Sequence, residues 1–397
     1  MTKTFNINDY GAIANTGEVQ TEAFQRCINA CHANGGGEVI VPTGSYIIGS
    51  IQLFSNISLI LQNRVHLIAS LDLKDYNDFG LQSTIAYYSD PYYINLWNLP
   101  KNYFQGLIVA YNAENISIVG SEDCIIDGRN LKNPEGEEKF RGPMTIVMSK
   151  VNHLTLSGYQ VKNAANWSHC LDSCRDIDIS QIEIIAGHDG FNLHHSQSIK
   201  IFNCRLITGD DCLAGYDIHN LLVDSCYLNT ACNVARVGGT NIKIIHSQIT
   251  GPGKYPHLST GTFTTHSLFK YYAIDDDAQQ TTSNQISFID CRVNQLMRLV
   301  DYQYKMTTMQ AGPELNQLNF VGGSISDIQK TSLFKGNGKK VILRFENMTF
   351  DTNIPFLLEI DQGVTVVFEN CKFNKPTSIQ LVNDKKYELF GEISKIF

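Results

Sequence analysis

A short alternation of apolar and variable residues recurs along most of the chain. Each copy has an apolar residue, a variable one, a second apolar one, and then a small or apolar residue two or three places later. The copies begin at Ile57, Ile116, Leu154, Ile177, Ile199, Leu221, Ile242 and Ile286, with weaker ones at Leu318, Leu343 and Val366. This pattern is typical of short β-strands, in which successive side chains point to opposite faces.

The spacing of the copies predicts how these strands stack. From Leu154 to Ile242 successive copies start 23, 22, 22 and 21 residues apart, and the next gap, to Ile286, is 44 residues, or two such periods. Three short strands with their turns need about 22 residues, whereas ankyrin and tetratricopeptide units need about 33 and 34. The sequence therefore predicts an all-β, single-domain parallel β-helix, in which each coil of the chain stacks on the previous one.

The start of the chain departs from this rhythm. Residues 1–55 are expected to form an N-terminal cap with the first strands, and residues 56–397 the coils of the same domain. A helix is predicted over residues 21–33, with one apolar face formed by Phe24, Cys27, Ile28 and Cys31. Three glycines follow and should end it. Such a helix can cover the open end of a β-helix.

Two long segments also break the repeat, near residues 72–104 and 251–277. We expect both to be loops that wall a groove. The first carries aromatic side chains that either stack on a sugar or pack the loop down, namely Tyr87, Tyr88, Tyr92, Tyr93 and Trp97.

Two positions of the repeat differ in chemistry. Five places after the starts lie small or apolar residues, namely Ile182, Cys204, Cys226, Ser247 and Cys291. They predict an inward ladder in which thiols act as small hydrophobes, in preference to metal or redox groups. Twelve places after the starts lie polar residues, namely Asn166, Asp189, Asp211, Asn233, Lys254 and Arg298. We expect this column to line the functional surface.

Composition narrows the possible partners. The 397 residues carry a formal net charge of −8, which argues against nucleic acid or an anionic membrane as the main partner. No apolar run approaches the roughly 20 residues that cross a bilayer. The first residues contain no apolar signal core, so the protein is expected to be cytoplasmic, or secreted if a signal was removed.

The aspartates carry the candidate chemistry. Asp189 and Asp211 are 22 residues apart, so one coil would separate them, and Asp210 adjoins Asp211. Stacked carboxylates repel, which costs stability and separates their pKa values. One can then hold a proton while another stays ionised, as glycosidic cleavage requires. The alternative is that Asp210 and Asp211 are ordinary turn residues facing solvent.

A series of motifs resembles the polygalacturonases, family 28 of the glycoside hydrolases, which are right-handed parallel β-helices. The motifs are Tyr10-Gly11-Ala12, residues 35–46 (GGGEVIVPTGSY), Ile126-Asp127-Gly128, residues 141–144 (RGPM), residues 163–167 (NAANW), His188-Asp189-Gly190 and residues 209–212 (GDDC). The likeness covers about residues 8–240. It implies an inverting hydrolase that uses no metal or other cofactor, with Asp210 as general acid and Asp189 with Asp211 activating water.

Several positions depart from the family pattern. His188 stands in a motif that is usually Asn-Thr-Asp, and Cys232 stands where the family has the histidine of Gly-His-Gly, thought to tune protonation of the acid. The substrate-binding candidates are Arg236, Arg298, Lys254, His188, Cys232 and Asn233. Arg236 either binds a substrate carboxylate or pairs with a neighbouring one. The expected substrate is an α-linked, uronate-containing oligosaccharide of pectic type, cleaved in an exo manner.

Two other classes of function stay open. An inactive carbohydrate-binding β-helix would bind sugars without turnover. A β-helix lyase would need Ca²⁺ on the carboxylates and a basic residue such as Lys254 or Arg298.

Overall fold

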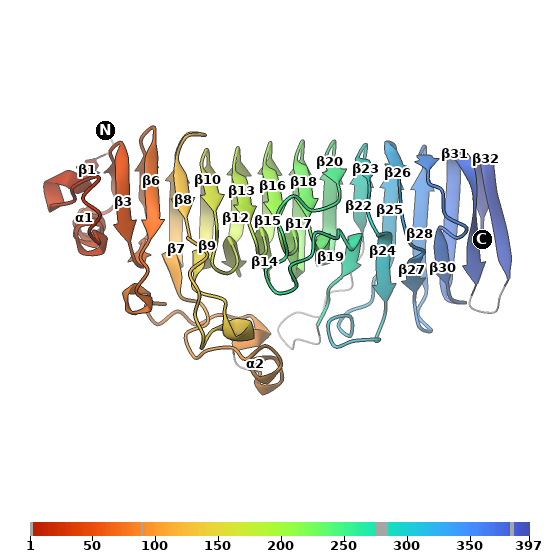
Figure 1. Ribbon diagram of the computed structural model, residues 1–397, viewed down its shortest axis with the longest axis horizontal. Coiled ribbons are helices and arrows are strands. Elements are labelled where there is room, and N and C mark those ends of the chain that lie inside the picture. Colours follow the sequence, from red (N-terminus) through yellow and green to blue (C-terminus); the bar gives the residue numbers. More distant parts are fainter. Residues whose placement is uncertain (1–2, 89, 275–284, 382–384) are drawn as a thin grey trace. The chain divides into compact units, whose positions relative to one another are not determined.

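The computed structural model describes residues 3–88, 90–274, 285–381 and 385–397. Contacts between residues divide the chain into two compact units, Met1–Arg205 and Leu206–Phe397. Most regular structure in both units is β-strand (Figure 1). Within the described residues, no helix is long and apolar enough to cross a membrane.

Among its described residues, the first unit contains two α-helices, four short 3₁₀ helices (η) and a succession of strands (Figure 1). In chain order they are β1 (Thr4–Asn6), η1 (Ile7–Tyr10), α1 (Thr21–Ala33), β2 (Gly37–Val41), β3 (Gly44–Ile48), β4 (Ile51–Gln52), β5 (Ile57–Leu61), β6 (Val65–Ala69), η2 (Leu73–Asp75), η3 (Ala86–Tyr88), α2 (Pro91–Trp97), β7 (Gly106–Val119), β8 (Ile125–Asp127), η4 (Glu137–Lys139), β9 (Met144–Ser157), β10 (Gln160–Lys162), β11 (His169–Asp172), β12 (Arg175–Ser180), β13 (Glu183–Ala186), β14 (Phe191–His194) and β15 (Gln197–Phe202).

The strands of the first unit pair in parallel, one coil apart, and the repeat predicted their register. Ile116 pairs with Leu154, Leu154 with Ile177, and Ile177 with Ile199. Side chains alternate between buried and more exposed positions along these strands, as in β5 and β6. The apolar residue of each copy therefore lies inside the coil, because the strand places alternate residues on opposite faces.

The predicted helix over residues 21–33 is α1, with the same bounds. Its predicted apolar face is fully buried, at 0% exposure for Phe24, Cys27, Ile28 and Cys31. The helix ends where Gly36 donates its backbone N–H to the carbonyl of Cys31 at 3.0 Å. Gly36 has a φ of +103°, and a Cβ there would lie 2.3 Å from the Asn56 carbonyl oxygen. Only glycine fits this close approach.

The first long segment is more regular than expected, because it contains α2. Asp90 caps this helix by accepting a 2.8 Å hydrogen bond from the backbone of Tyr92, and Pro91 follows at the first helical position. Asp172 anchors the segment to a coil. Its carboxylate accepts hydrogen bonds from the hydroxyls of Ser83 at 2.9 Å and Thr84 at 2.6 Å.

The aromatic side chains of this segment mainly pack it down. Tyr87 and Tyr93 are 4% and 6% exposed. Their ring centroids lie 4.7 and 5.3 Å from that of Trp97, in edge and stacked arrangements. Tyr92 is the exposed member, at 49%. The side chain of Tyr88 lies outside the described residues.

The second unit continues with β16 (Arg205–Thr208), which begins at the boundary residue. The other elements are β17 (Leu213–Asp224), β18 (Tyr227–Thr230), β19 (Asn233–Ile245), β20 (Gln248–Thr250), β21 (Ser267–Tyr271), β22 (Ile286–Ile289), β23 (Arg292–Asn294), β24 (Arg298–Gln303), β25 (Gln317–Val321), β26 (Ser324–Ser326), β27 (Ser332–Lys335), β28 (Val341–Glu346), β29 (Thr349–Asp351), β30 (Leu358–Ile360), β31 (Val364–Leu381) and β32 (Lys386–Ile396).

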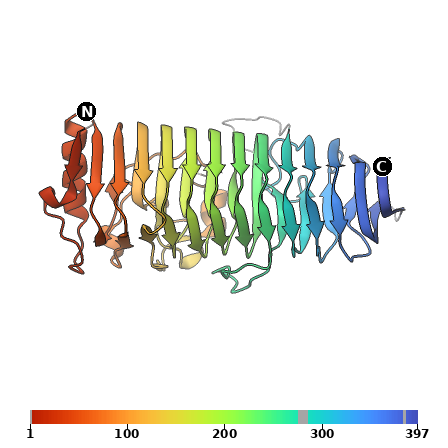
Figure 2. The same ribbon diagram turned by 90° about the horizontal axis from the view of Figure 1, so that it is seen from above.

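Copies of the repeat also pair one coil apart in the second unit, but one spacing was interpreted wrongly. Leu221 pairs with Ile242, and Ile242 pairs directly with Ile286. The 44-residue gap between Ile242 and Ile286 is therefore a single coil carrying insertions, and the prediction of two periods is wrong. Figure 2 shows the first of these insertions, residues 251–266, as a green loop projecting from the strands. Residues 275–277 of the predicted loop lie outside the described residues.

The core of the second unit changes from thiols to phenyl rings along the chain. Cys226 and Cys291 are 3% and 4% exposed, which confirms the inward position predicted for them, and Cys204 of the first unit is similar at 2%. Further on, four rings stack coil upon coil at centroid separations of 5.2, 5.1 and 5.0 Å, namely Phe288, Phe320, Phe345 and Phe368. These separations are close to the strand spacing, so each ring lies over the next. At the C-terminus β32 pairs antiparallel with β31.

Candidate active site

Asp210 and Asp211 lie in the turn between β16 and β17, and hydrogen bonds fix that turn. The backbone carbonyl of Asp210 accepts a hydrogen bond from the Thr208 hydroxyl at 2.7 Å and another from the Thr230 hydroxyl. The backbone N–H of Asp211 donates to the Asp210 Oδ1 at 3.1 Å. The Asp210 side chain is 16% exposed, whereas that of Asp211 is 1% exposed. Asp210 is thus the carboxylate that a ligand can reach.

Asp211 is held on both of its oxygens. Its Oδ1 accepts from the backbone N–H of Asn233 at 3.0 Å and from the Asn233 side-chain amide at 2.8 Å. Its Oδ2 accepts from the Arg236 Nε at 2.5 Å. The Arg236 guanidinium also lies over the ring of Tyr272, 4.3 Å from the centroid. Of the two interpretations of Arg236, the structure supports pairing with a neighbouring carboxylate.

The polar column of the second unit differs from the predicted one. Asn233 pairs with Ser267, and Ser267 pairs with Arg298, so Ser267 occupies the place predicted for Lys254. Lys254 lies in the inserted loop, with its Nζ 4.9 Å from the centroid of the Tyr227 ring. The prediction that Lys254 belongs to the column is wrong, because counting twelve places ran into the insertion.

Two column residues make hydrogen bonds within the protein. The Asn233 amide oxygen accepts a 2.7 Å hydrogen bond from the Ser267 hydroxyl, while its nitrogen donates to Asp211. The Arg298 Nε donates to the carbonyl of Thr331 at 3.0 Å. Asn233 therefore positions Asp211.

The inserted loop, residues 251–266, brings two histidines to the turn. The backbone N–H of His257 donates to the Thr262 carbonyl at 2.9 Å, and that of Gly261 donates to the His257 carbonyl at 2.7 Å. At the start of the loop, Gly253 passes so close to the coil that a Cβ would lie 2.6 Å from the backbone nitrogen of Ala231. At its end, the backbone N–H of His266 donates to the carbonyl of Cys232 at 2.6 Å.

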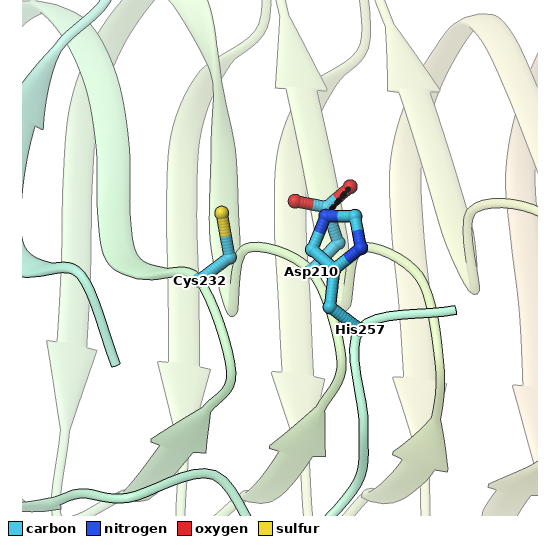
Figure 3. Close-up of side chains that lie close together, drawn as sticks. All are labelled: Asp210, Cys232 and His257. Carbon is cyan, nitrogen blue, oxygen red and sulfur yellow. Dashed lines mark ion pairs between the residues drawn. The ribbon is translucent and has the colours of Figure 1, made fainter. Parts of the chain in front are cut away.

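His257 contacts the exposed aspartate. Its Nε2 lies 3.6 Å from the Asp210 Oδ2, and its side chain is 13% exposed. Figure 3 shows the His257 imidazole lying against the Asp210 carboxylate, with the Cys232 thiol beside them. His257 was not predicted from the sequence, because no repeat places a residue within an insertion. The irregular 44-residue spacing and the histidines inside it were the available signal.

Cys232 is half-buried between charged and polar groups. Its Sγ accepts from the Asn233 side-chain nitrogen at 3.3 Å and lies 3.8 Å from the His266 Nδ1. Burial, with the nearby negative charges of Asp211 and Asp210, raises the pKa of the Cys232 thiol well above its ordinary value. Burial lowers the pKa of His266 below its ordinary value. Both groups are therefore mostly uncharged at neutral pH.

The first unit holds the remaining predicted residues. Asp189 is 2% exposed, and its Oδ2 accepts a 2.6 Å hydrogen bond from the Asn192 side chain. His188 is 1% exposed, with its ring centroid 5.8 Å from that of Phe140. Asn166 donates to the Glu137 Oε2 at 3.2 Å, which makes it part of a buried network. All three side chains are buried.

Part of the chain matches a known protein family and several of its members. Residues 31–235 match the family model of the glycosyl hydrolases family 28. A probable polygalacturonase of Vitis vinifera is 25% identical over 228 residues, covering 54% of this chain and 45% of the relative. Exopolygalacturonase A of Aspergillus niger is 24% identical over 215 residues, covering 49% and 44%. The matched region thus spans less than half the length of these curated relatives.

Solved structures show the same fold. The family 28 exopolygalacturonase of Yersinia enterocolitica superposes with a TM-score of 0.68 at 16% identity, covering 96% of this chain and 77% of that one. The exopolygalacturonase of Thermotoga maritima superposes with a TM-score of 0.67 at 16% identity, covering 99% and 95%. These likenesses, with the parallel register of each unit, confirm the expected all-β parallel fold. The family model covers more than half of the chain, from residue 31 to residue 235, and the chain therefore belongs to the glycosyl hydrolases of family 28.

Proposed function

We propose that this protein is an inverting glycoside hydrolase that cleaves α-linked, uronate-containing oligosaccharides of pectic type, with Asp210 as the general acid. The observation that carries the assignment is the contrast between two adjacent carboxylates. Asp210 is accessible and contacts His257, whereas Asp211 is buried and held by Asn233 and Arg236. Family membership and the names of the relatives support the class of reaction.

The proposed reaction assigns one proton transfer to each side of the glycosidic bond. Asp210 donates its proton to the leaving oxygen as the bond to the anomeric carbon breaks. A water attacks that carbon from the opposite face and gives up a proton to Asp189, which the motif resemblance assigns to water activation together with Asp211. The sugar product then carries the water oxygen on an inverted anomeric carbon, and no cofactor enters the balance.

Asp211 and His257 are proposed to control the proton on Asp210 from two directions. The fixed charge of Asp211 disfavours a second negative charge beside it, which helps Asp210 to stay protonated. His257 can accept a hydrogen bond from the protonated carboxyl and orient it. We propose that His257 takes the place of the family histidine that Cys232 replaces, although it comes from the insertion and not from the coil.

The substrate assignment rests on charge near the turn. Uronates carry a carboxylate, which guanidinium groups bind in a two-point manner. Arg298 is the proposed partner in the column, and Lys254 and Arg236 are proposed to add positive potential. His188, Cys232 and Asn233 are proposed to shape the subsite. An exo mode is proposed because the relatives include exopolygalacturonases.

Incubation with a panel of pectic oligosaccharides tests the proposal, with product mass and ultraviolet absorbance recorded together. A mass gain of one water per cleavage, without new absorbance, is expected. New absorbance without added water would instead identify a lyase, because elimination leaves an unsaturated sugar. Binding without any product would identify a carbohydrate-binding protein. Either of these results would overturn the hydrolase assignment.

A further inference from the structure

We propose that Asp210, Cys232 and His257 form a binding site for a thiophilic divalent cation such as Zn²⁺, and that the bound ion blocks cleavage. One potential ligand atom from each residue, a carboxylate oxygen, the Sγ and an imidazole nitrogen, lies within 4.8 Å of the other two. The three side chains gather at one place although they come from different segments, as Figure 3 shows. The blocking of cleavage rests on the proposed function of Asp210, whereas the binding does not.

The separations fit a tetrahedral ion after a small closure. Zn²⁺ binds nitrogen and oxygen at about 2.0–2.2 Å and sulfur at about 2.3 Å, so its ligands lie roughly 3.5 Å apart. The His257 Nε2 and the Asp210 Oδ2 are already 3.6 Å apart. Because the sulfur lies within 4.8 Å of the other two ligand atoms, it has to approach by no more than about 1.3 Å, which a change of side-chain torsion supplies.

The backbone beneath each ligand is fixed. Two threonine hydroxyls bind the carbonyl of Asp210, and one of them, that of Thr230, also accepts the backbone N–H of Cys232 at 2.9 Å. The backbone of His257 is fixed by the hydrogen bonds of its own turn. Binding therefore orders little additional chain, which favours affinity.

The donor set selects the kind of ion. Sulfur and imidazole ligands favour Zn²⁺ and similar transition metals, whereas Mg²⁺ and Ca²⁺ prefer oxygen alone. The Asn233 side-chain nitrogen, 3.3 Å from the Cys232 Sγ, can orient the sulfur as outer partners of metal ligands commonly do. The Nδ1 of His266 lies 3.8 Å from that sulfur, and water can take the fourth position at the ion.

A bound ion would inhibit because it uses the proposed acid. The Asp210 oxygen that binds the ion cannot deliver a proton, and the ion lies where the leaving oxygen must approach. The chain thus carries a built-in site for reversible inhibition by Zn²⁺, in a family reaction that requires no metal for its proton transfers.

Titration of the chelator-treated full chain with Co²⁺ tests the site, because cobalt reports a sulfur ligand by a thiolate-to-metal charge-transfer band. One equivalent is expected to produce this band, and added Zn²⁺ should remove it by displacing the cobalt. Cys232→Ser should abolish the band, and His257→Gln should weaken Co²⁺ binding at least tenfold. The matched controls Cys226→Ser, in the buried ladder, and His246→Gln, on an exposed turn, should bind like the wild type.

Absence of the band, or its persistence in Cys232→Ser, would overturn the proposed site. Should Cys232→Ser fail to fold, His257→Gln gives an independent answer, and affinity equal to the wild type in that variant would contradict the proposal. In a separate assay with a cleaved substrate, Zn²⁺ should lower wild-type turnover at least tenfold and a chelator should restore it. The Co²⁺ titration contains no substrate, so a failure of the proposed hydrolase function leaves its outcome unaffected.

Discussion

The Nε2 of His257 lies 3.6 Å from the Oδ2 of Asp210, although the two residues are 47 positions apart and His257 comes from an insertion. The same kind of pair occurs between His246 and Asp224 on an exposed turn of the second unit, at 3.0 Å. This second pair lacks the buried surroundings of the first, with the His246 side chain 55% exposed. Variants of His246 and Asp224 can therefore serve as matched controls for variants of His257 and Asp210.

His257→Gln should reduce turnover about tenfold, because the acid loses a group that orients it. Steady-state rates measure this loss. His246→Gln should retain wild-type turnover, and wild-type turnover in His257→Gln would remove the histidine from the proposed mechanism.

Asp210→Asn should lower turnover by about 10²–10⁴-fold, since the amide cannot donate an acidic proton. The melting temperature should stay equal or rise, because a negative charge beside Asp211 is removed. Steady-state rates and thermal unfolding check the two effects. Asp224→Asn is the control and should retain wild-type turnover. Wild-type turnover in Asp210→Asn would remove Asp210 from the mechanism.

Arg236→Met should destabilise the fold by about 2–3 kcal/mol, because it leaves the buried Asp211 without its charged partner. The Arg236 side chain is 22% exposed, which lowers the effect relative to a fully buried pair. Urea unfolding measures it. Asp211→Asn combined with Arg236→Met should recover part of the loss.

Arg205→Met offers a control, because Arg205 and Glu183 form a 2.9 Å pair with side chains 44% and 27% exposed. Its cost should stay below about 1 kcal/mol. Equal costs for the Arg236 and Arg205 variants would contradict the account of Asp211 as a buried, dependent charge.

His169 should make the fold sensitive to acid. It is 0% exposed, and burial lowers its pKa from 6.5 to about 3. Between these two pKa values, His169 is therefore protonated in the unfolded chain and neutral in the folded chain. The contribution of neutral His169 to the free energy of unfolding is fully present above about pH 6.5. It falls as the pH drops towards 3, by roughly 2 kcal/mol between pH 6.5 and pH 5.

Urea unfolding at a series of pH values measures this slope. His169→Gln should flatten it, because glutamine does not titrate. His153→Gln, at a residue 61% exposed, should keep the wild-type slope. An unchanged slope in His169→Gln would assign the acid sensitivity to other groups.

The repeat predicted the register of the coils because the strand period and the coil period both leave a signal in sequence. The pairings of Leu154 with Ile177 and of Ile286 with Leu318 follow from it directly. The burial of Cys226 and Cys291 follows from the same count. The position of Asp189 relative to Asp211 stays a prediction.

Residues in insertions could not be placed in this way. Lys254 was assigned to the column because counting continued through the loop, whereas Ser267 stands there. His257 was missed for the same reason, since a loop folds back according to contacts such as that between His266 and Cys232. The partner of Arg236 was left open, because sequence spacing does not choose between a ligand and a carboxylate within reach.

Inversion with Asp210 as the acid is tested by ¹H NMR of the anomeric protons during the first minutes of cleavage of a pectic oligosaccharide that the panel identifies. An inverting enzyme acting on an α-linkage should release the β-anomer first, with the α-anomer appearing later by mutarotation. Asp210→Asn should produce neither signal on this timescale, and Asp224→Asn should behave as the wild type. Initial release of the α-anomer, or undiminished product from Asp210→Asn, would contradict inverting hydrolysis with Asp210 as the acid.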